Sequence, residues 1–105
     1  MNEVYANPGP SRAEVDVLPG PTMLEFGSPT CGICYAAQPV IAEATEGLSQ
    51  LRHIKIEDGR GRRLGRSFGI KLWPTLVFLK DGQEVVRLVR PANTAVIKNA
   101  LSLII

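Results

Sequence analysis

Two cysteines, the only two in the 105-residue chain, stand close together as Cys31-Gly32-Ile33-Cys34. They follow an apolar segment, residues 23–26, and a short turn, residues 27–30, so a helix is expected to begin at Cys31. Unpaired backbone N–H groups at a helix start carry partial positive charge and favour a thiolate over a thiol. The pattern therefore predicts that Cys31 is the reactive sulfur and that the pair can close a small disulfide ring.

Length and charge exclude several classes of protein. A chain of this length suits one domain, and its formal net charge of +2 gives no sign of nucleic-acid binding. Basic residues gather between Arg52 and Lys71, which we interpret as a solvated surface, with a docking surface as the alternative. No stretch approaches the roughly 20 apolar residues that a membrane span needs, and residues 1–20 lack a signal-peptide pattern. We therefore expect a cytoplasmic protein that binds neither nucleic acid nor membrane.

The remaining pattern predicts an α/β fold around a mixed sheet, in the order βαβ, helix, ββα. Residues 1–20 are expected to be mostly irregular, with a short helix capped by Ser11 and Glu14, and residues 21–105 to form the folded domain. Asp81-Gly82 predicts a hairpin, so the last two strands should run antiparallel. The last helix should be capped by Asn93 or Thr94. Strands are expected at 22–26, 52–57, 75–79 and 84–89, and helices at 34–48 and 61–68. The apolar stripe of the last helix lies between residues 96 and 104.

Several motifs in this order resemble the thioredoxin family. The first is Glu-Phe-Gly-Ser-Pro-Thr-Cys-Gly-Ile-Cys at residues 25–34, which leads into a helix that contains Pro39. The others are Trp73-Pro74-Thr75 and the hairpin Lys80-Asp81-Gly82. The resemblance covers about residues 21–101, and it implies a thioredoxin fold and a protein-disulfide oxidoreductase.

The resemblance also implies a role for each site residue. Cys31 would attack a substrate disulfide, and Cys34 would resolve the mixed disulfide that forms. Pro74 would be a cis-proline that lies against the disulfide and leaves backbone groups free to pair with an extended substrate. Residues expected to contact the substrate are Gly32, Ile33, Trp73 and Thr75.

Glu25 is a charged residue inside an otherwise apolar strand. Cys34, one turn into its helix, should be buried and should keep its proton until the mixed disulfide forms, so a base must then remove that proton. Glu25 is the candidate, at a position where most family members that resemble this chain have aspartate. The alternative is a solvated carboxylate at an edge. His53 or Lys55, on the neighbouring strand, would approach it.

The chain departs from the family pattern at three further positions. Many relatives have tryptophan before the first cysteine and proline between the pair, where this chain has Thr30 and Ile33. Both changes can shift the reduction potential. Trp73, where relatives usually have a smaller residue, either flanks the disulfide or packs in the core.

The main prediction is a disulfide reductase that takes electrons from a thioredoxin-reductase-like donor and passes them to protein disulfides. One alternative keeps the fold but makes a thiol oxidase, an isomerase or a client-specific redox protein. Another is a non-enzymatic module that binds a partner or a metal. Zinc generally needs four ligands, and the chain offers two cysteines and His53. We therefore expect no metal, and no cofactor beyond the cysteine pair. We also expect a monomer.

Overall fold

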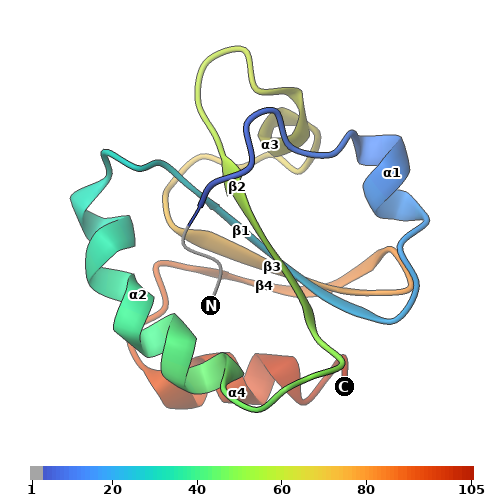
Figure 1. The fold of residues 1–105 in the computed structure, drawn as a ribbon, viewed down its shortest axis with the longest axis vertical. Helices are drawn as coiled ribbons and strands as arrows, with labels where there is room; N and C mark the ends of the chain where they lie inside the picture. The colour runs from blue at the N-terminus through green and yellow to red at the C-terminus, as the bar shows by residue number, and fades with distance from the viewer. Residues whose placement is uncertain (1–3) are drawn as a thin grey trace.

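The computed structural model describes residues 4–105; residues 1–3 of the expected irregular segment 1–20 lie outside the described residues. Four strands form one sheet with helices on both faces (Figure 1). The predicted α/β fold and its order of elements are confirmed. In chain order the elements are α1 (Arg12–Asp16), β1 (Pro21–Gly27), α2 (Gly32–Thr45), β2 (Arg52–Glu57), α3 (Arg63–Ser67), β3 (Thr75–Lys80), β4 (Gln83–Val89) and α4 (Thr94–Leu101).

The sheet is mixed, with strand order β2-β1-β3-β4. β1 lies parallel to β2, in a register that pairs Glu25 with Lys55, and antiparallel to β3, which starts opposite Phe26. The hairpin between β3 and β4 turns at Asp81-Gly82, where both residues have positive φ, as the sequence predicts. Because β1 is paired on both sides and covered on both faces, residues 22–27 are all buried.

Two apolar clusters hold the helices on the sheet. α2 and α4 cover one face, and α1 and α3 cover the other (Figure 1). On the α1 face, Val15 is fully buried in the same cluster as Leu24 and Phe68, so even the short first helix contributes to the core. The cluster on the α2 face consists of Met23, Ile41, Ala44, Leu76, Phe78, Ile97, Ala100, Leu101 and Ile104.

The helix boundaries differ from the predicted ones where capping and glycine act. α2 begins at Gly32 with Cys31 as its N-cap, which agrees with the helix start expected at Cys31 and lies before residue 34, where the apolar helical pattern begins. It ends at Thr45 rather than at residue 48, since Gly47 takes a φ of 78° that a helix does not allow. Gly61, with a φ of 80°, likewise delays the start of α3. α4 spans Thr94–Leu101, and Asn93 is its cap.

The segment before α1 pairs with the outer edge of the sheet. The predicted capping box of Ser11 and Glu14 is confirmed at the start of α1. Earlier in the chain, Ala6 forms a parallel bridge with Ile56 of β2. This bridge places Tyr5 beside the strand that also carries two polar residues of the candidate site.

Candidate active site

Three strand ends bring the predicted site residues to one end of the sheet. β1 and β2 run parallel and finish together, while β3 runs the other way and starts with Thr75 opposite Phe26. The loop after β2 stays at this end, because the N–H of Asp58 donates to the carbonyl of Gly27 at 2.8 Å. The turn into α2 and the Trp73-Pro74 turn therefore leave the sheet at the same end.

The two cysteines lie in different surroundings at the start of α2. The sulfur of Cys31 accepts a hydrogen bond from the backbone N–H of Cys34 at 3.1 Å, which is the helix-start geometry that favours negative charge on sulfur. Cys31 is half-buried, whereas Cys34 is 1% exposed. One thiol can therefore meet a substrate, and the other is enclosed beneath it.

Burial is also the main reason that Cys34 holds its proton. A hydrogen bond between its thiol and Cys31, together with the negative charges of Cys31 and Glu25, acts in the same direction. The backbone N–H of Ser28 points at the sulfur and opposes them. Together these effects raise the pKa of Cys34 to about 12. Cys34 is therefore a neutral thiol across the physiological pH range.

Glu25 is completely buried, and both of its carboxylate oxygens have partners. Oε1 lies 2.8 Å from Nε2 of His53, and Oε2 accepts from Nε2 of Gln38 at 2.9 Å. The expected approach of a basic residue from the neighbouring strand is confirmed for His53, which is 14% exposed. Glu25 is therefore not a solvated carboxylate at a sheet edge, but an interior acid connected to a partly exposed imidazole.

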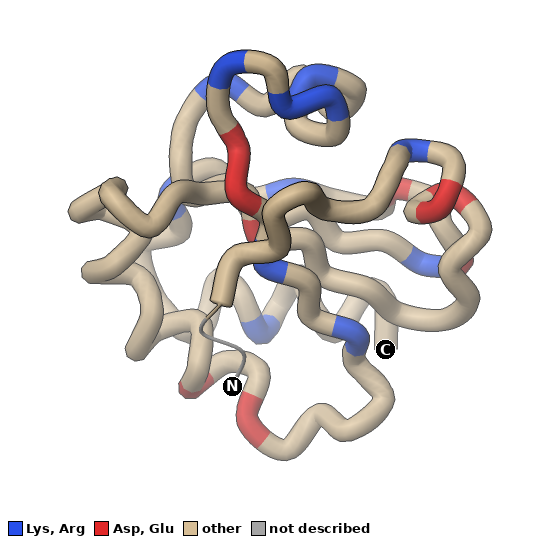
Figure 2. The backbone as a smooth tube through the Cα atoms, turned by 45° about the horizontal axis from the view of Figure 1, so that its top comes forward, with Lys and Arg blue, Asp and Glu red and all other residues tan. Residues whose placement is uncertain are grey.

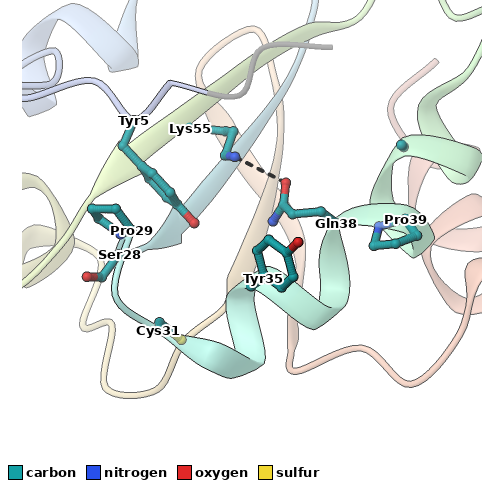
Figure 3. A pocket seen from close by; sticks show the side chains of 9 residues that line it. Tyr5, Ser28, Pro29, Cys31, Tyr35, Gln38, Pro39 and Lys55 are labelled. Carbon is teal, nitrogen blue, oxygen red and sulfur yellow. Dashed lines mark hydrogen bonds between the residues drawn. The ribbon is translucent and has the colours of Figure 1, made fainter.

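Gln38 joins this acid to the helix that carries the cysteines. Its side-chain N–H₂ also donates to the carbonyl of Cys34 at 2.8 Å, and its oxygen accepts from Lys55 at 3.1 Å (Figure 3). Lys55 is 3% exposed, so its charge stays within the network. Sequence reasoning missed Gln38. The available signal was its position one helical turn after Cys34, on the same side of the helix.

The turn before β3 has the predicted cis Trp73-Pro74 bond. The indole N–H of Trp73 donates to Asp58 at 2.9 Å, and its carbonyl accepts from the side chain of Arg90 at 2.8 Å. Trp73 is thus half-buried and anchored to Asp58 and Arg90, rather than packed in the core. Thr75 is 1% exposed, and its hydroxyl donates to the carbonyl of Leu72. Any contact between Thr75 and a substrate is therefore left to its backbone.

A groove of about 500 Å³ runs beside the first turns of α2 (Figure 3). Tyr5, which sequence reasoning did not single out, forms part of its wall. The ring of Tyr5 stacks under the ammonium of Lys55, whose Nζ lies 4.4 Å from the ring centroid. The residues that line the groove are Tyr5, Ser28, Pro29, Cys31, Tyr35, Gln38, Pro39, Ala42 and Lys55.

The basic segment after β2 forms one edge of the same end of the molecule. Figure 2 shows its Lys and Arg gathered in the loop that follows β2 and along α3. Arg62 pairs with Glu57 at 3.2 Å, while Arg60 and Arg66 are exposed and line a shallow groove beside Trp73. Most of this charge is solvated, as interpreted from the sequence.

The described part of the chain, residues 4–105, has no group of three or more His, Cys, Asp or Glu side chains arranged to hold a metal ion. Within the same residues, no helix combines the length and the apolar character needed to cross a membrane.

A buried thiol beneath an N-capping cysteine, beside a cis-proline turn in an α/β sheet, is the arrangement of a thiol–disulfide oxidoreductase. The model of the thioredoxin family matches residues 12–102, and the chain belongs to this family. Members of the family act on protein disulfides through a redox-active cysteine pair, and the protein is accordingly a protein-disulfide oxidoreductase.

Similar proteins span most of the chain. The structure of thioredoxin 2 from Pseudomonas aeruginosa, in its reduced form, is 51% identical with a TM-score of 0.86, and the match covers 98% of this chain and 95% of that one. A thioredoxin of Mycobacterium tuberculosis is 34% identical over 83 residues, 78% of this chain and 72% of that protein. Thioredoxin 1 of Synechococcus elongatus is 30% identical over 82 residues, 77% of each chain.

The raised pKa of Cys34 makes the stability of the reduced protein depend on alkaline pH. The unfolded chain releases this proton near the ordinary value of 9, whereas the folded protein holds it to about 12. The stabilising contribution is therefore complete below pH 9 and is lost as the pH rises toward 12. Above pH 9, the free energy of unfolding should fall by about 1.4 kcal/mol per pH unit more in the reduced protein than in Cys34→Ser. Urea unfolding between pH 8 and 11 measures this difference, and parallel curves for the two proteins would contradict the assignment.

Proposed function

We propose that the protein is a reductant of protein disulfides that cycles between a Cys31 and Cys34 dithiol and their disulfide. The observation that supports this most strongly is the unequal pair at the start of α2. Cys31 is reachable and accepts a backbone hydrogen bond at 3.1 Å, while Cys34 is buried and protonated. Such a pair gives one sulfur for attack and keeps the second in reserve.

The cycle transfers two electrons in two exchanges. The Cys31 thiolate attacks one sulfur of a client disulfide; the client S–S bond breaks, and the leaving client thiolate takes a proton from water. Cys34 then loses its proton and attacks the sulfur of Cys31. The bond between Cys31 and the client breaks, and the second client thiolate leaves. The client is now reduced, and the protein holds a Cys31–Cys34 disulfide.

Glu25 is the group that we propose to accept the proton of Cys34. Its charge is close enough to contribute to the raised pKa of Cys34, and it has no contact with solvent of its own. The imidazole of His53, 2.8 Å away and 14% exposed, gives the proton a way to solvent. Gln38 fixes the carboxylate relative to the helix.

The client would dock over the exposed side of this end of the molecule. Gly32 and Ile33 lie on the outer side of the first turn of α2, with Ile33 48% exposed. The turn of Trp73 and Pro74 leads into β3 at the same end of the sheet. An apolar contact with Ile33 and Trp73, together with backbone pairing beside Pro74, would hold an extended client segment.

We also propose an electron donor for the protein and a cellular compartment in which it acts. A thioredoxin-reductase-like donor would return two electrons to the disulfide, as it does for members of the family. The protein would need no metal and no cofactor beyond its cysteine pair. It would work as a monomer in the cytoplasm, where reducing conditions keep such a pair available as a dithiol.

The direction of electron flow is tested by the reduction potential of the Cys31 and Cys34 pair. Equilibration with dithiothreitol or glutathione should place it near the value of about −270 mV that is typical of thioredoxin. Thr30 and Ile33, which depart from the family pattern beside the cysteines, are the residues that can shift this potential. A potential near the value of about −120 mV of a strong oxidant would instead identify a thiol oxidase.

The role of Glu25 can be measured with a nitrobenzoate disulfide, which releases a coloured thiolate when Cys31 attacks and a second one when Cys34 attacks. Glu25→Gln preserves the shape of the side chain but cannot take a proton. At pH 7 it should leave the first phase intact and slow the second by about tenfold or more. The defect should shrink at higher pH, where solvent removes the proton.

Glu43→Gln is the matched control, because Glu43 lies on the exposed side of α2 and contacts Thr94 rather than the site. Both phases should be unchanged in this variant. If Glu25→Gln also left the second phase at its original rate across the pH range, Glu25 would not be the proton acceptor.

A further inference from the structure

Tyr5 enters the active site from a segment that precedes residues 12–102, the part matched by the family model. Two backbone hydrogen bonds fix this segment to the edge of β2. The N–H of Ala6 donates to the carbonyl of Lys55 at 2.8 Å, and the N–H of Glu57 donates to the carbonyl of Ala6 at 3.2 Å. Both the N–H and the carbonyl of Ala6 are thus bonded to β2, and these bonds fix the backbone beside Tyr5.

The ring of Tyr5 is oriented by the buried lysine. Nζ of Lys55 lies 4.4 Å from the centre of the ring and also donates to Gln38 at 3.1 Å, so the ammonium is held between the two side chains. Figure 3 shows the ring extending from the N-terminal segment toward the first turns of α2. The hydroxyl therefore lies on the inner side of α2, the side on which Cys34 is buried.

The hydroxyl meets the sulfur of Cys34 above Gly27. A Cβ added at Gly27 would lie 2.9 Å from Sγ of Cys34 and 3.0 Å from the hydroxyl oxygen of Tyr5, so the two atoms share this space. The phenol is therefore within the electrostatic influence of the sulfur. Burial, and then the negative charge available on Cys34, raise the pKa of Tyr5 above its ordinary range. The phenol therefore keeps its proton at neutral pH and is available as a donor.

We propose that Tyr5 is a catalytic residue, whose hydroxyl donates a hydrogen bond to the sulfur of Cys34 while that sulfur attacks the mixed disulfide. The proposal rests on the proposed function, since it concerns the second exchange of that cycle. Once Cys31 is bonded to a client, it is no longer a negative sulfur that keeps the proton on Cys34. The hydroxyl of Tyr5 and the backbone N–H of Ser28 then stabilise the Cys34 thiolate.

The chemistry of the step leaves Tyr5 unchanged. Cys34 gives its proton to the base, and its electron pair forms the bond to the sulfur of Cys31. The bond between Cys31 and the client breaks, and the client sulfur leaves with that electron pair. The phenolic proton remains on the oxygen of Tyr5, which acts only by stabilising charge on the attacking sulfur.

Tyr5→Phe tests the proposal, because it removes the hydroxyl and keeps the ring that contacts Lys55. In the two-phase nitrobenzoate reaction, the first phase should match the unmodified protein. The second should slow by about tenfold, the effect of one hydrogen bond to a charged atom, and its pH midpoint should rise. Tyr35→Phe is the matched control: Tyr35 lines the same groove but is 82% exposed, and both phases should be unaffected.

The outcomes separate this inference from the proposed function. Absence of a first phase in the unmodified protein would contradict the cycle itself. A normal first phase, with a second phase in Tyr5→Phe that keeps the rate and pH midpoint of the unmodified protein, would overturn only the role of Tyr5. An equal slowing in Tyr35→Phe would also overturn it, because that effect would not depend on contact with the sulfur.

A second measurement covers the case in which Tyr5→Phe does not fold. The chain has two tyrosines, so 3-fluorotyrosine incorporated into Tyr35→Phe labels Tyr5 alone. The fluorinated phenol is a stronger hydrogen-bond donor. It should accelerate the second phase and lower its pH midpoint relative to Tyr35→Phe with ordinary tyrosine, whereas an unchanged or slower second phase would contradict the proposal.

Discussion

The close packing of Cys34 on the backbone of Gly27 is the contact on which the rest of the site depends. Gly27 ends the buried strand β1, and any side chain there would collide with the sulfur. Because the position is a glycine, α2 can lie close enough to the sheet to enclose the thiol completely. Burial at this contact is the main cause of the raised pKa of Cys34, and it separates the chemistry of the two cysteines.

The polar side chains around this contact form one connected network. The network consists of Tyr5, Glu25, Gln38, His53 and Lys55, and each contacts another member through a hydrogen bond or, for Tyr5, through the Lys55 ammonium over its ring. A buried network of this kind is favourable only when its members are satisfied. Among the described residues, no buried side-chain nitrogen or oxygen lacks a partner. The interior can therefore hold charge beside a thiol that must change its own charge during turnover.

The fold and the core of the site could be predicted because they depend on local pattern. The apolar strand, the helix start at Cys31 and the Asp81-Gly82 turn each act over a few residues, and the burial of Glu25 follows from its apolar neighbours. The cis bond before Pro74 has no such local signal and was implied by the family resemblance alone.

Other features depend on tertiary contacts that no local pattern reports. Tyr5 reaches Cys34 only because Ala6 pairs with β2, and that pairing is a single bridge without strand periodicity. Thr75 begins the buried strand β3, but its hydroxyl donates to the carbonyl of Leu72 rather than facing a substrate. Gln38 could be placed on the right side of α2, but its partners Glu25 and Lys55 come from strands that the helix covers.

The difference between the two thiols is the central claim, and residue-resolved alkylation of the reduced protein tests it most directly. Iodoacetamide at pH 7 to 9, followed by peptide mapping, should modify Cys31 and leave Cys34 intact, while both should react after unfolding in urea. Comparable labelling of Cys34 in the folded protein, or labelling of Cys34 before Cys31, would contradict the account.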